Sequence, residues 1–277
     1  MPTDPASPSA AAKSAPRADG AAPARPGARP GELARNRIAA SASIVAVAGS
    51  GGVTRLPVLA SQVPLVLRRT PDAVYVVGGA AGPIGGDELS LRISVGAGAF
   101  LRVRTAAASI ALPGPDGLES VLRLSVSVGP GACLEYLPEP VVITTGARHA
   151  TVVSVSLDEG ASLLLRDELL LGRHGEDGGA ARTVLRVDYA GRPLLRQSLE
   201  VSGADQASMG PAVLAGHRAV GTLLRVNACP AEPPLESFPP TTEVAALPLA
   251  GPGVLVTAVA HDAVALRQRL ALQHFYL

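Results

Sequence analysis

One short pattern occurs three times in succession along the chain. Each copy is a segment in which apolar and polar residues alternate, then a tight turn that closes with Gly-Ala, then a second apolar segment. The copies cover residues 89–105, 122–137 and 151–166. Val95, Val128 and Leu157 are equivalent, so the copies recur after 33 and then 29 residues. Alternation with a period of two is typical of a β-strand that buries one face, and this spacing is typical of units that stack on one another.

The repeat predicts an all-β fold. In each turn one glycine, Gly98, Gly131 or Gly160, stands where positive φ is needed. We interpret each copy as an antiparallel hairpin-like unit, and residues 184–199 as a fourth such pairing. The units are expected to stack as a β-helix or solenoid, or as a two-layer sheet.

Helix signals are few and lie toward the C-terminus. Asp262 is a suitable N-cap for a helix over residues 263–270, which are good helix formers. Residues 212–226 fit either a short helix interrupted at Gly221 or two strands. A few short helices near the C-terminus are therefore expected beside the β-structure.

The first 37 residues differ in composition from the rest of the chain. They are dominated by Ala, Pro and Gly with scattered Arg, a composition that cannot bury enough apolar surface to offset its ordering entropy. We predict a disordered tail over residues 1–37 and one β domain over residues 38–277.

Charge and hydropathy exclude several classes of partner. The formal net charge is +1 and no stripe of Lys or Arg follows residue 40, so neither nucleic acid nor an anionic membrane is an expected partner. No apolar run reaches the ~18 residues of a membrane span, and the N-terminus lacks the apolar core of a secretion signal. We expect a cytoplasmic protein. Cys133 and Cys229 could pair with each other, but in a reducing cytosol we expect two buried free thiols.

The sequence carries no motif for catalysis. The glycine-rich loop at residues 78–87 lacks the Lys-Ser or Lys-Thr of a phosphate-binding loop, and no Gly-x-Ser-x-Gly elbow is present. The five histidines are dispersed, without the spacing of a metal site. One enzymatic alternative stays open: Glu135 with Glu139, or Asp167 with Glu168, could serve a β-solenoid hydrolase acting on carbohydrates.

Several segments resemble one known family. They are AAGPIGGD at 80–87, TAAA at 105–108, GACLEYLP at 131–138, LGR at 171–173 and GRPLL at 191–195. Their order and spacing resemble the UreD family of urease accessory proteins, in its actinobacterial form, over about residues 41–224 and more loosely beyond. Tyr136 replaces the usual Trp of that family, and residues 109–112 lack its usual Lys and aromatic residue.

The resemblance implies a non-catalytic maturation factor rather than an enzyme. Proteins of this family form a β-helix-like scaffold that binds apo-urease and, through UreF, recruits the GTPase UreG, with UreE as a nickel donor. The resemblance implies no permanently bound cofactor, with Ni²⁺ in transit through an internal polar passage.

Two groups of residues follow as candidate sites. For the signature loop, the structural residues are expected to be Gly82, Gly85, Gly86 and Asp87, with the Asp87 carboxylate accepting backbone N–H bonds that hold the turn. For a metal conduit or partner contact we nominate Glu135, His149, Asp167 and Glu168, because carboxylate and imidazole groups can pass a divalent ion between them. Each of these four can equally be an ordinary solvated side chain.

Overall fold

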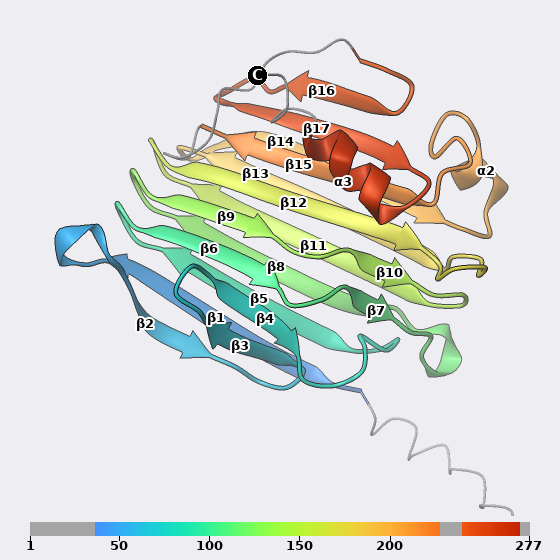
Figure 1. Cartoon of the computed structure of the whole chain (residues 1–277), viewed down its shortest axis with the longest axis horizontal. Helices are drawn as coiled ribbons and strands as arrows, with labels where there is room; N and C mark the ends of the chain where they lie inside the picture. Colours follow the sequence, from blue (N-terminus) through green and yellow to red (C-terminus); the bar gives the residue numbers. More distant parts are fainter. Residues whose placement is uncertain (1–36, 228–239, 272–277) are drawn as a thin grey trace, which may run out of the picture. The chain divides into compact units, whose positions relative to one another are not determined.

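The computed structural model describes residues 37–227 and 240–271, which are mostly β-strand (Figure 1). A seven-stranded sheet has the order β14 (Arg192–Ser202), β13 (Ala180–Tyr189), β11 (Arg148–Leu157), β8 (Ser120–Val128), β5 (Glu88–Val95), β1 (Ala39–Ala48) and β2 (Thr54–Ala60). A ten-stranded sheet has the main path β16 (Val244–Pro248), β17 (Gly253–Ala260), β15 (Ala219–Val226), β12 (Ser162–Leu171), β9 (Cys133–Leu137), β6 (Phe100–Thr105), β4 (Val74–Gly78) and β3 (Leu65–Arg69). Two short strands complete it, with β10 (Val141–Ile143) pairing β12 and β7 (Ser109–Ala111). Apart from Arg37, the predicted tail lies outside the described residues.

The central strands of both sheets run parallel. In the seven-stranded sheet β1, β5, β8, β11 and β13 pair in parallel, and in the ten-stranded sheet β4, β6, β9 and β12 do the same. The chain passes from β5 to β6, then from β8 to β9, and then from β11 to β12, one strand further along each time. This is the winding of a β-solenoid, so the predicted all-β, stacked fold is confirmed.

Within the first three copies of the repeat, the predicted antiparallel pairing is wrong. Each Gly-Ala turn connects a strand of one sheet to a strand of the other, so β5 pairs with β1 and β8 instead of β6. The turns have the predicted positive φ at Gly98 (66°), Gly131 (63°) and Gly160 (74°). A strand–turn–strand segment has the same period whether its turn joins neighbours in one sheet or crosses between two sheets, and the sequence does not distinguish them. The fourth pairing, β13 with β14, is an antiparallel hairpin as predicted.

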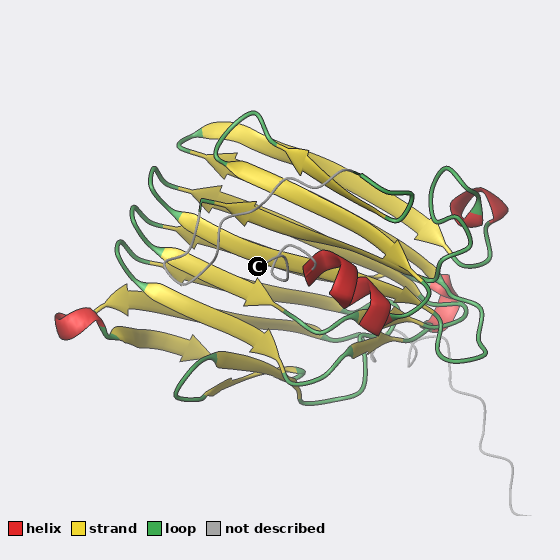
Figure 2. Cartoon of the chain, turned by 45° about the horizontal axis from the view of Figure 1, so that its top comes forward, coloured by secondary structure: helices red, strands yellow, loops and turns green. Residues whose placement is uncertain are grey.

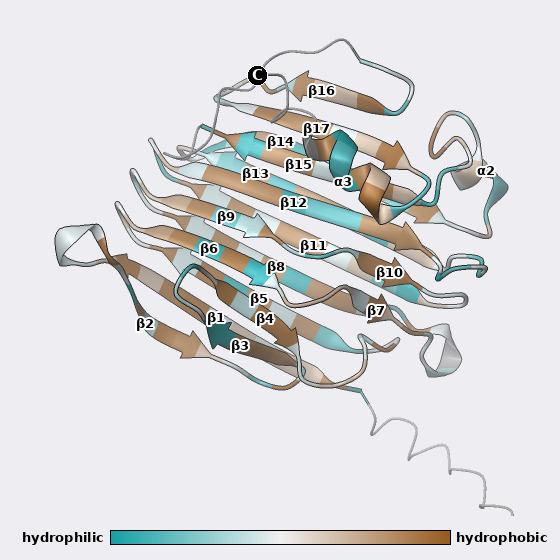
Figure 3. Ribbon diagram, in the orientation of Figure 1, coloured by the Kyte–Doolittle hydropathy of each residue, from teal (hydrophilic) through white to brown (hydrophobic). Residues whose placement is uncertain are grey.

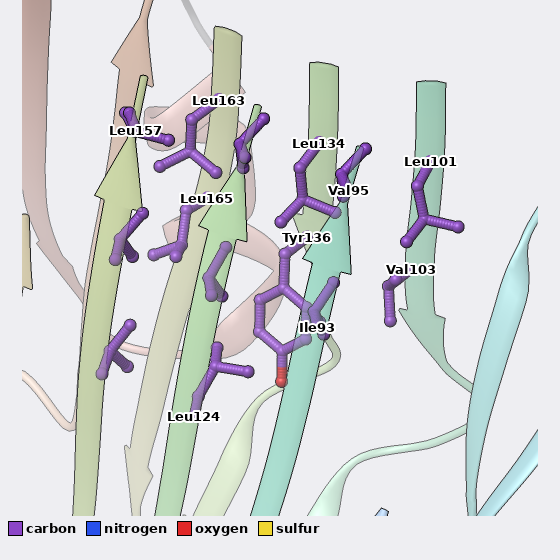
Figure 4. Close-up of a cluster of buried hydrophobic side chains, with 14 of the residues drawn as sticks. Ile93, Val95, Leu101, Val103, Leu124, Leu134, Tyr136, Leu157, Leu163 and Leu165 are labelled. Atoms are coloured by element: carbon purple, nitrogen blue, oxygen red, sulfur yellow. The ribbon is translucent and has the colours of Figure 1, made fainter. Parts of the chain in front are cut away.

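Apolar side chains fill the space between the two sheets. Ile93, Val126 and Val155 are register partners on adjacent strands of the seven-stranded sheet, and all three are buried. Leu134 and Leu163 are paired in the same way on the ten-stranded sheet and are fully buried. Figure 4 shows Ile93 of one sheet and Leu134 and Leu163 of the other within one cluster of apolar side chains, with the Tyr136 ring beside them. Stacking the coils therefore gives continuous apolar ladders across adjacent strands, and Figure 3 shows brown, apolar segments on the strands of both sheets.

The predicted C-terminal helix is confirmed as α3 (Ala263–Ala271), and the Asp262 carboxylate caps it by accepting from the Ala265 N–H at 2.8 Å. Its side chains Leu266 and Leu270 are buried against β15 and β17. Figure 2 shows α3 lying on the face of the sheet. A one-turn helix, α2 (Gln206–Met209), and two 3₁₀ turns, η2 (Ser50–Gly52) and η3 (Pro115–Gly117), are the other helical elements described.

Residues 212–226 follow neither predicted alternative. Ala215 and Gly216 have positive φ (49° and 79°) and end a series of turns, after which β15 is one continuous strand. Gly221 lies within this strand, where there is no room for a side chain. A Cβ at this position would lie 3.1 Å from the Leu266 side chain and 2.9 Å from the Asp167 carbonyl oxygen. The glycine thus permits α3 to pack closely on the sheet.

Two further expectations concern Cys133 and membranes. Cys133 is disulfide-bonded, so the predicted free thiol is wrong, and Cys229 lies outside the described residues. The sequence could not predict this bond, because the spacing of cysteines along the chain does not say which segments lie next to the start of β9 in the folded solenoid. Among the described helices, none has the length and apolar character needed to cross a bilayer.

Candidate functional site

The ten-stranded sheet has a gap beside β12. β9 pairs with residues 162–165 of β12, and β10 pairs with residues 169–171. Between β9 and β10 the chain reads Pro138-Glu139-Pro140, and neither proline has an N–H to continue the ladder. Arg166, Asp167 and Glu168 therefore have no strand partner on that edge, although β12 continues to pair with β15 on the other.

Alternation along β12 places these three side chains on opposite faces of the sheet. Leu165 and Leu169 belong to the core between the sheets, so Asp167, which shares their frame, points into the interior. Arg166 and Glu168 point to the outer face, where Arg267 of α3 meets them. The gap consequently has an outer, ionic side and an inner side with one carboxylate.

Four charged side chains close the gap from outside and form what we call the ionic cover: Glu139, Arg166, Glu168 and Arg267. Arg267 donates to both oxygens of Glu139 at 3.1 Å and to Glu168 Oε2 at 2.7 Å. Arg166 Nε lies 3.3 Å from the same Glu168 oxygen, and Arg166 Nη2 donates to the Pro138 carbonyl at 2.8 Å. The hydrogen bond to Glu168 raises the pKa of Arg267, whereas burial is the main cause that lowers the pKa of Arg166. Glu168 is buried and forms ion pairs with both arginines, so neither its charge nor theirs is left unpaired in the cover.

On the inner side, Asp167 lines two small cavities. One, of about 120 Å³, contains Thr183, Gln197 and Thr222 among its lining residues, and the other, of about 50 Å³, contains Tyr136 and Thr151. Burial raises the pKa of Asp167 to about 6, and the nearby Thr183 hydroxyl lowers it, although that hydroxyl makes no hydrogen bond of regular geometry within the described residues. Burial and then the Asp167 charge raise the pKa of Tyr136.

His149 also lies in the interior and is neutral at physiological pH. Its Nδ1 lies 2.9 Å from Ser120 Oγ, and its Nε2 lies 3.3 Å from Thr151 Oγ1. Burial lowers its pKa to about 4. Because Thr151 lines the smaller cavity, His149 supports the wall of the cavity through a hydroxyl rather than facing Asp167 directly.

Glu135 lies elsewhere. It is on the outer face of β9, where Arg102 Nε and Arg104 Nη2 donate to its Oε2 at 2.9 and 2.7 Å. The structure therefore brings together Asp167 and, through Thr151, His149 in the interior. It places Glu168 in the ionic cover and Glu135 in a separate ion cluster, so the four nominated residues do not line one passage.

The glycine-rich loop has a structural arrangement. The Asp87 carboxylate is buried and accepts from the Ile38 and Ile84 N–H groups, each at 2.9 Å. Gly82 and Gly86 have positive φ (133° and 97°). A Cβ at Gly85 would lie 2.3 Å from the Leu118 carbonyl oxygen, so close backbone approach requires glycine there. These contacts join the start of β1 to the start of β5.

No group of three His, Cys, Asp or Glu side chains is placed to hold a metal ion in the parts of the chain that the structure describes. The carboxylate pairs considered for a hydrolase are not placed to work together: Asp167 and Glu168 both line the cavity of about 50 Å³, but they lie on opposite faces of the sheet, and Glu168 is ion-paired with arginines. Glu135 and Glu139 are each held by arginines. The geometry gives the hydrolase alternative no support.

Four residues around the gap and its cavities were not among the candidates from the sequence: Thr151, Arg166, Thr183 and Arg267. A signal for two of them was present, because Thr151 and Thr183 are polar residues in the inward frame of their strands, as Asp167 is. Arg267 lies 99 residues from Glu168, and no local pattern connects them.

Known proteins resemble this chain over most of its length. The family model described as UreD urease accessory protein matches residues 39–275. "Urease accessory protein UreD" of Parafrankia sp. is 43% identical over 266 residues, covering 85% of this chain and 88% of that protein. "Urease accessory protein UreD 3" of Streptomyces griseus is 49% identical over 226 residues, covering 78% and 88%. The Frankia alni protein is 41% identical over 292 residues, covering 91% and 96%. The chain therefore belongs to the UreD family of urease accessory proteins, which implies a role in urease maturation.

Proposed function

We propose that this protein is a scaffold for nickel insertion, one that binds apo-urease in the cytoplasm together with UreF and the GTPase UreG. The observation that carries the proposal is the family match over residues 39–275. In this assembly UreG hydrolyses GTP, UreE donates nickel to the system, and the present chain supplies binding surface and no covalent chemistry.

The interior around Asp167 is the region of this chain best suited to meet the ion. Its carboxylate, with the hydroxyls of Tyr136, Thr151 and Thr183, provides oxygen ligands inside the solenoid. A partly buried carboxylate that is mostly ionised at pH 7 attracts a divalent cation more strongly than an exposed one, because water screens it less. Cavities of 120 and 50 Å³ have room for a few water molecules, at ~30 Å³ each, around an ion in transit.

The ionic cover is a barrier that a nickel ion would have to pass in order to enter the interior through the gap. Arg267 and Arg166 close the gap beside Asp167 from the outer face. A cation that crosses the sheet here must pass these two positive charges, so the proposal requires a partner that draws α3 and Arg267 away from Glu168.

The maturation role is tested in a host that expresses the cognate urease operon with and without this gene. We expect loss of urease activity, with purified urease that is poor in nickel. Full activity and normal nickel content without the gene would remove the functional proposal and leave the fold.

The role of Asp167 needs a separate test. Asp167→Asn keeps the size of the side chain and removes its charge, and Asp158→Asn makes the same change at an exposed turn. We expect D167N to assemble with its partners in a pull-down while the nickel content of urease falls, and D158N to behave as wild type. Normal nickel loading by an assembled D167N complex would overturn the interior route but not the maturation role.

A further inference from the structure

The outer face of the seven-stranded sheet carries a row of short hydroxyl side chains between arginines. Successive strands align six residues in register across this face. They are Ser43, Arg92, Ser125, Ser154, Arg186 and Arg196. The next row includes Ser94, Ser127 and Ser156, so the centre of the face consists of serines two strands wide.

This arrangement forms a shallow trough. A hollow of about 400 Å³ lies over Ser125, Ser127, Ser154 and Ser156, and all four serines are exposed. Arg92 on β5 and Arg186 on β13 stand three strand spacings apart, about 14 Å at 4.7–4.9 Å per strand. A trough of this width admits an extended segment, or a helix of 10–12 Å diameter, between the two arginine side chains.

The charge of the trough is unbalanced. Arg196 forms an ion pair with Asp188, whereas Arg92, Arg123 and Arg186 are exposed and make no ion pair with any described residue. Exposed arginines next to neutral hydroxyl groups give a positive potential that the protein itself does not offset within the described part. The floor presents hydroxyl groups to solvent, so it offers hydrogen bonds more than apolar contact.

We infer that this trough is a docking surface for an acidic segment of a partner protein. Carboxylates on the two sides of such a segment would reach Arg92 and Arg186, whose planar guanidinium groups bind carboxylates through paired hydrogen bonds. The serine hydroxyls beneath would meet the polar atoms of the segment. Duplex nucleic acid is disfavoured because the net charge is +1 and the basic side chains form one short cluster instead of a long stripe. The inference does not rest on the nickel role and is tested without urease.

The binding test uses the full chain and a fluorescent twelve-residue peptide of alternating Glu and Ala as the probe. Arg92→Ser with Arg186→Ser continues the serine row of the neighbouring strands, and Arg68→Ser with Arg69→Ser makes the same charge change on exposed residues of β3. We expect the trough variant to bind the peptide about tenfold more weakly than wild type in low salt, with the β3 variant unchanged. Equal weakening in both variants, or none in either, would overturn the inference.

A second measurement locates the bound segment and separates the occupants. A photo-crosslinker on Ser154→Cys should capture the acidic peptide, whereas the same label on Ser50→Cys, at the exposed η2 turn, should not. Circular dichroism of every variant confirms that the fold is retained. Tighter binding of a DNA oligonucleotide than of the peptide at the labelled trough would contradict an acidic protein segment as the occupant.

Discussion

The interior of the solenoid differs sharply between its two ends. Toward the Gly-Ala turns the ladders are wholly apolar, with Ile93, Val126 and Leu134 buried in continuous rows. Toward the gap in the ten-stranded sheet, β12, β11 and β13 present Asp167, His149 and Thr183 to the interior. The first arrangement is what stacking coils need for stability. The second lowers stability, since buried polar groups are costly, and its presence in a chain otherwise rich in apolar residues points to function.

The largest effect is expected in the apolar rows. Leu134→Ala removes a fully buried side chain between two coils, and the residual cavity should cost about 4 kcal/mol of unfolding free energy. Urea unfolding measures this loss. A cost below that of an exposed substitution would show that the apolar end is not the stabilising region.

The second-largest loss of unfolding free energy is expected from a substitution in the ionic cover. Glu168→Gln removes the charge of a buried carboxylate and leaves the partly buried Arg166 with Glu139, 4.0 Å away, as its carboxylate partner among the described residues. Breaking such a pair should cost about 3 kcal/mol. Glu139→Gln, at a carboxylate that is 37% exposed, serves as the matched control and should cost less than about 1 kcal/mol. If both variants unfolded at the same urea concentration, the cover would be an ordinary surface cluster.

Removing the charge of the interior carboxylate, Asp167, should raise the unfolding free energy, whereas the two preceding substitutions lower it. Its folded pKa of about 6 lies above the ~3.9 of an unfolded Asp. The folded state thus holds this proton to higher pH than the unfolded state, and its stability falls as pH rises from 4 to 6. Asp167→Asn should therefore be more stable than wild type by about 3 kcal/mol at pH 7.5 and equal to it near pH 3.5. A destabilised D167N at pH 7.5 would contradict the view that this carboxylate is retained at a cost.

The smallest effect is expected from His149, whose contribution to the unfolding free energy changes with pH in the direction opposite to that of Asp167. His149 has a folded pKa of about 4, below the ~6.5 of an unfolded His, so the unfolded state binds more protons between these values. Stability then falls as pH drops, by about 2 kcal/mol between pH 7 and pH 5 from this group. His149→Gln should remove that part of the slope in thermal unfolding. An unchanged slope would mean that His149 is protonated in the folded protein.

Period-two patterns carry the information on which side chains face inward, and they predict the stacked β-fold of this chain correctly. The same frame places Asp167, one of the nominated residues, on the inward face of its strand, which it shares with Leu163, Leu165 and Leu169. It could not reveal that the Gly-Ala turns cross between sheets, because a crossing turn and a hairpin turn need the same glycine.

The site depends on contacts that local patterns do not encode. Pro138 and Pro140 open the ladder, but the closure of the gap comes from Arg267 on α3, far along the chain. Family resemblance supplied the functional expectation, whereas the separation of Glu135 from Asp167 followed only from the position of each strand in space.

Parallel stacking also determines how the chain can fold during synthesis. Ile93 pairs with Val126 and Val126 with Val155, so each coil contacts the one made 33 or 29 residues earlier (126 − 93 and 155 − 126). A ribosome therefore delivers each new strand to an edge that already exists, and the chain can extend coil by coil. The antiparallel return of β14 on β13 then ends the growing edge in the seven-stranded sheet. Until that strand emerges, the edge of the newest coil is open to pairing with another nascent chain, so misassembly in this sheet is most favoured before residues 192–202 have been made.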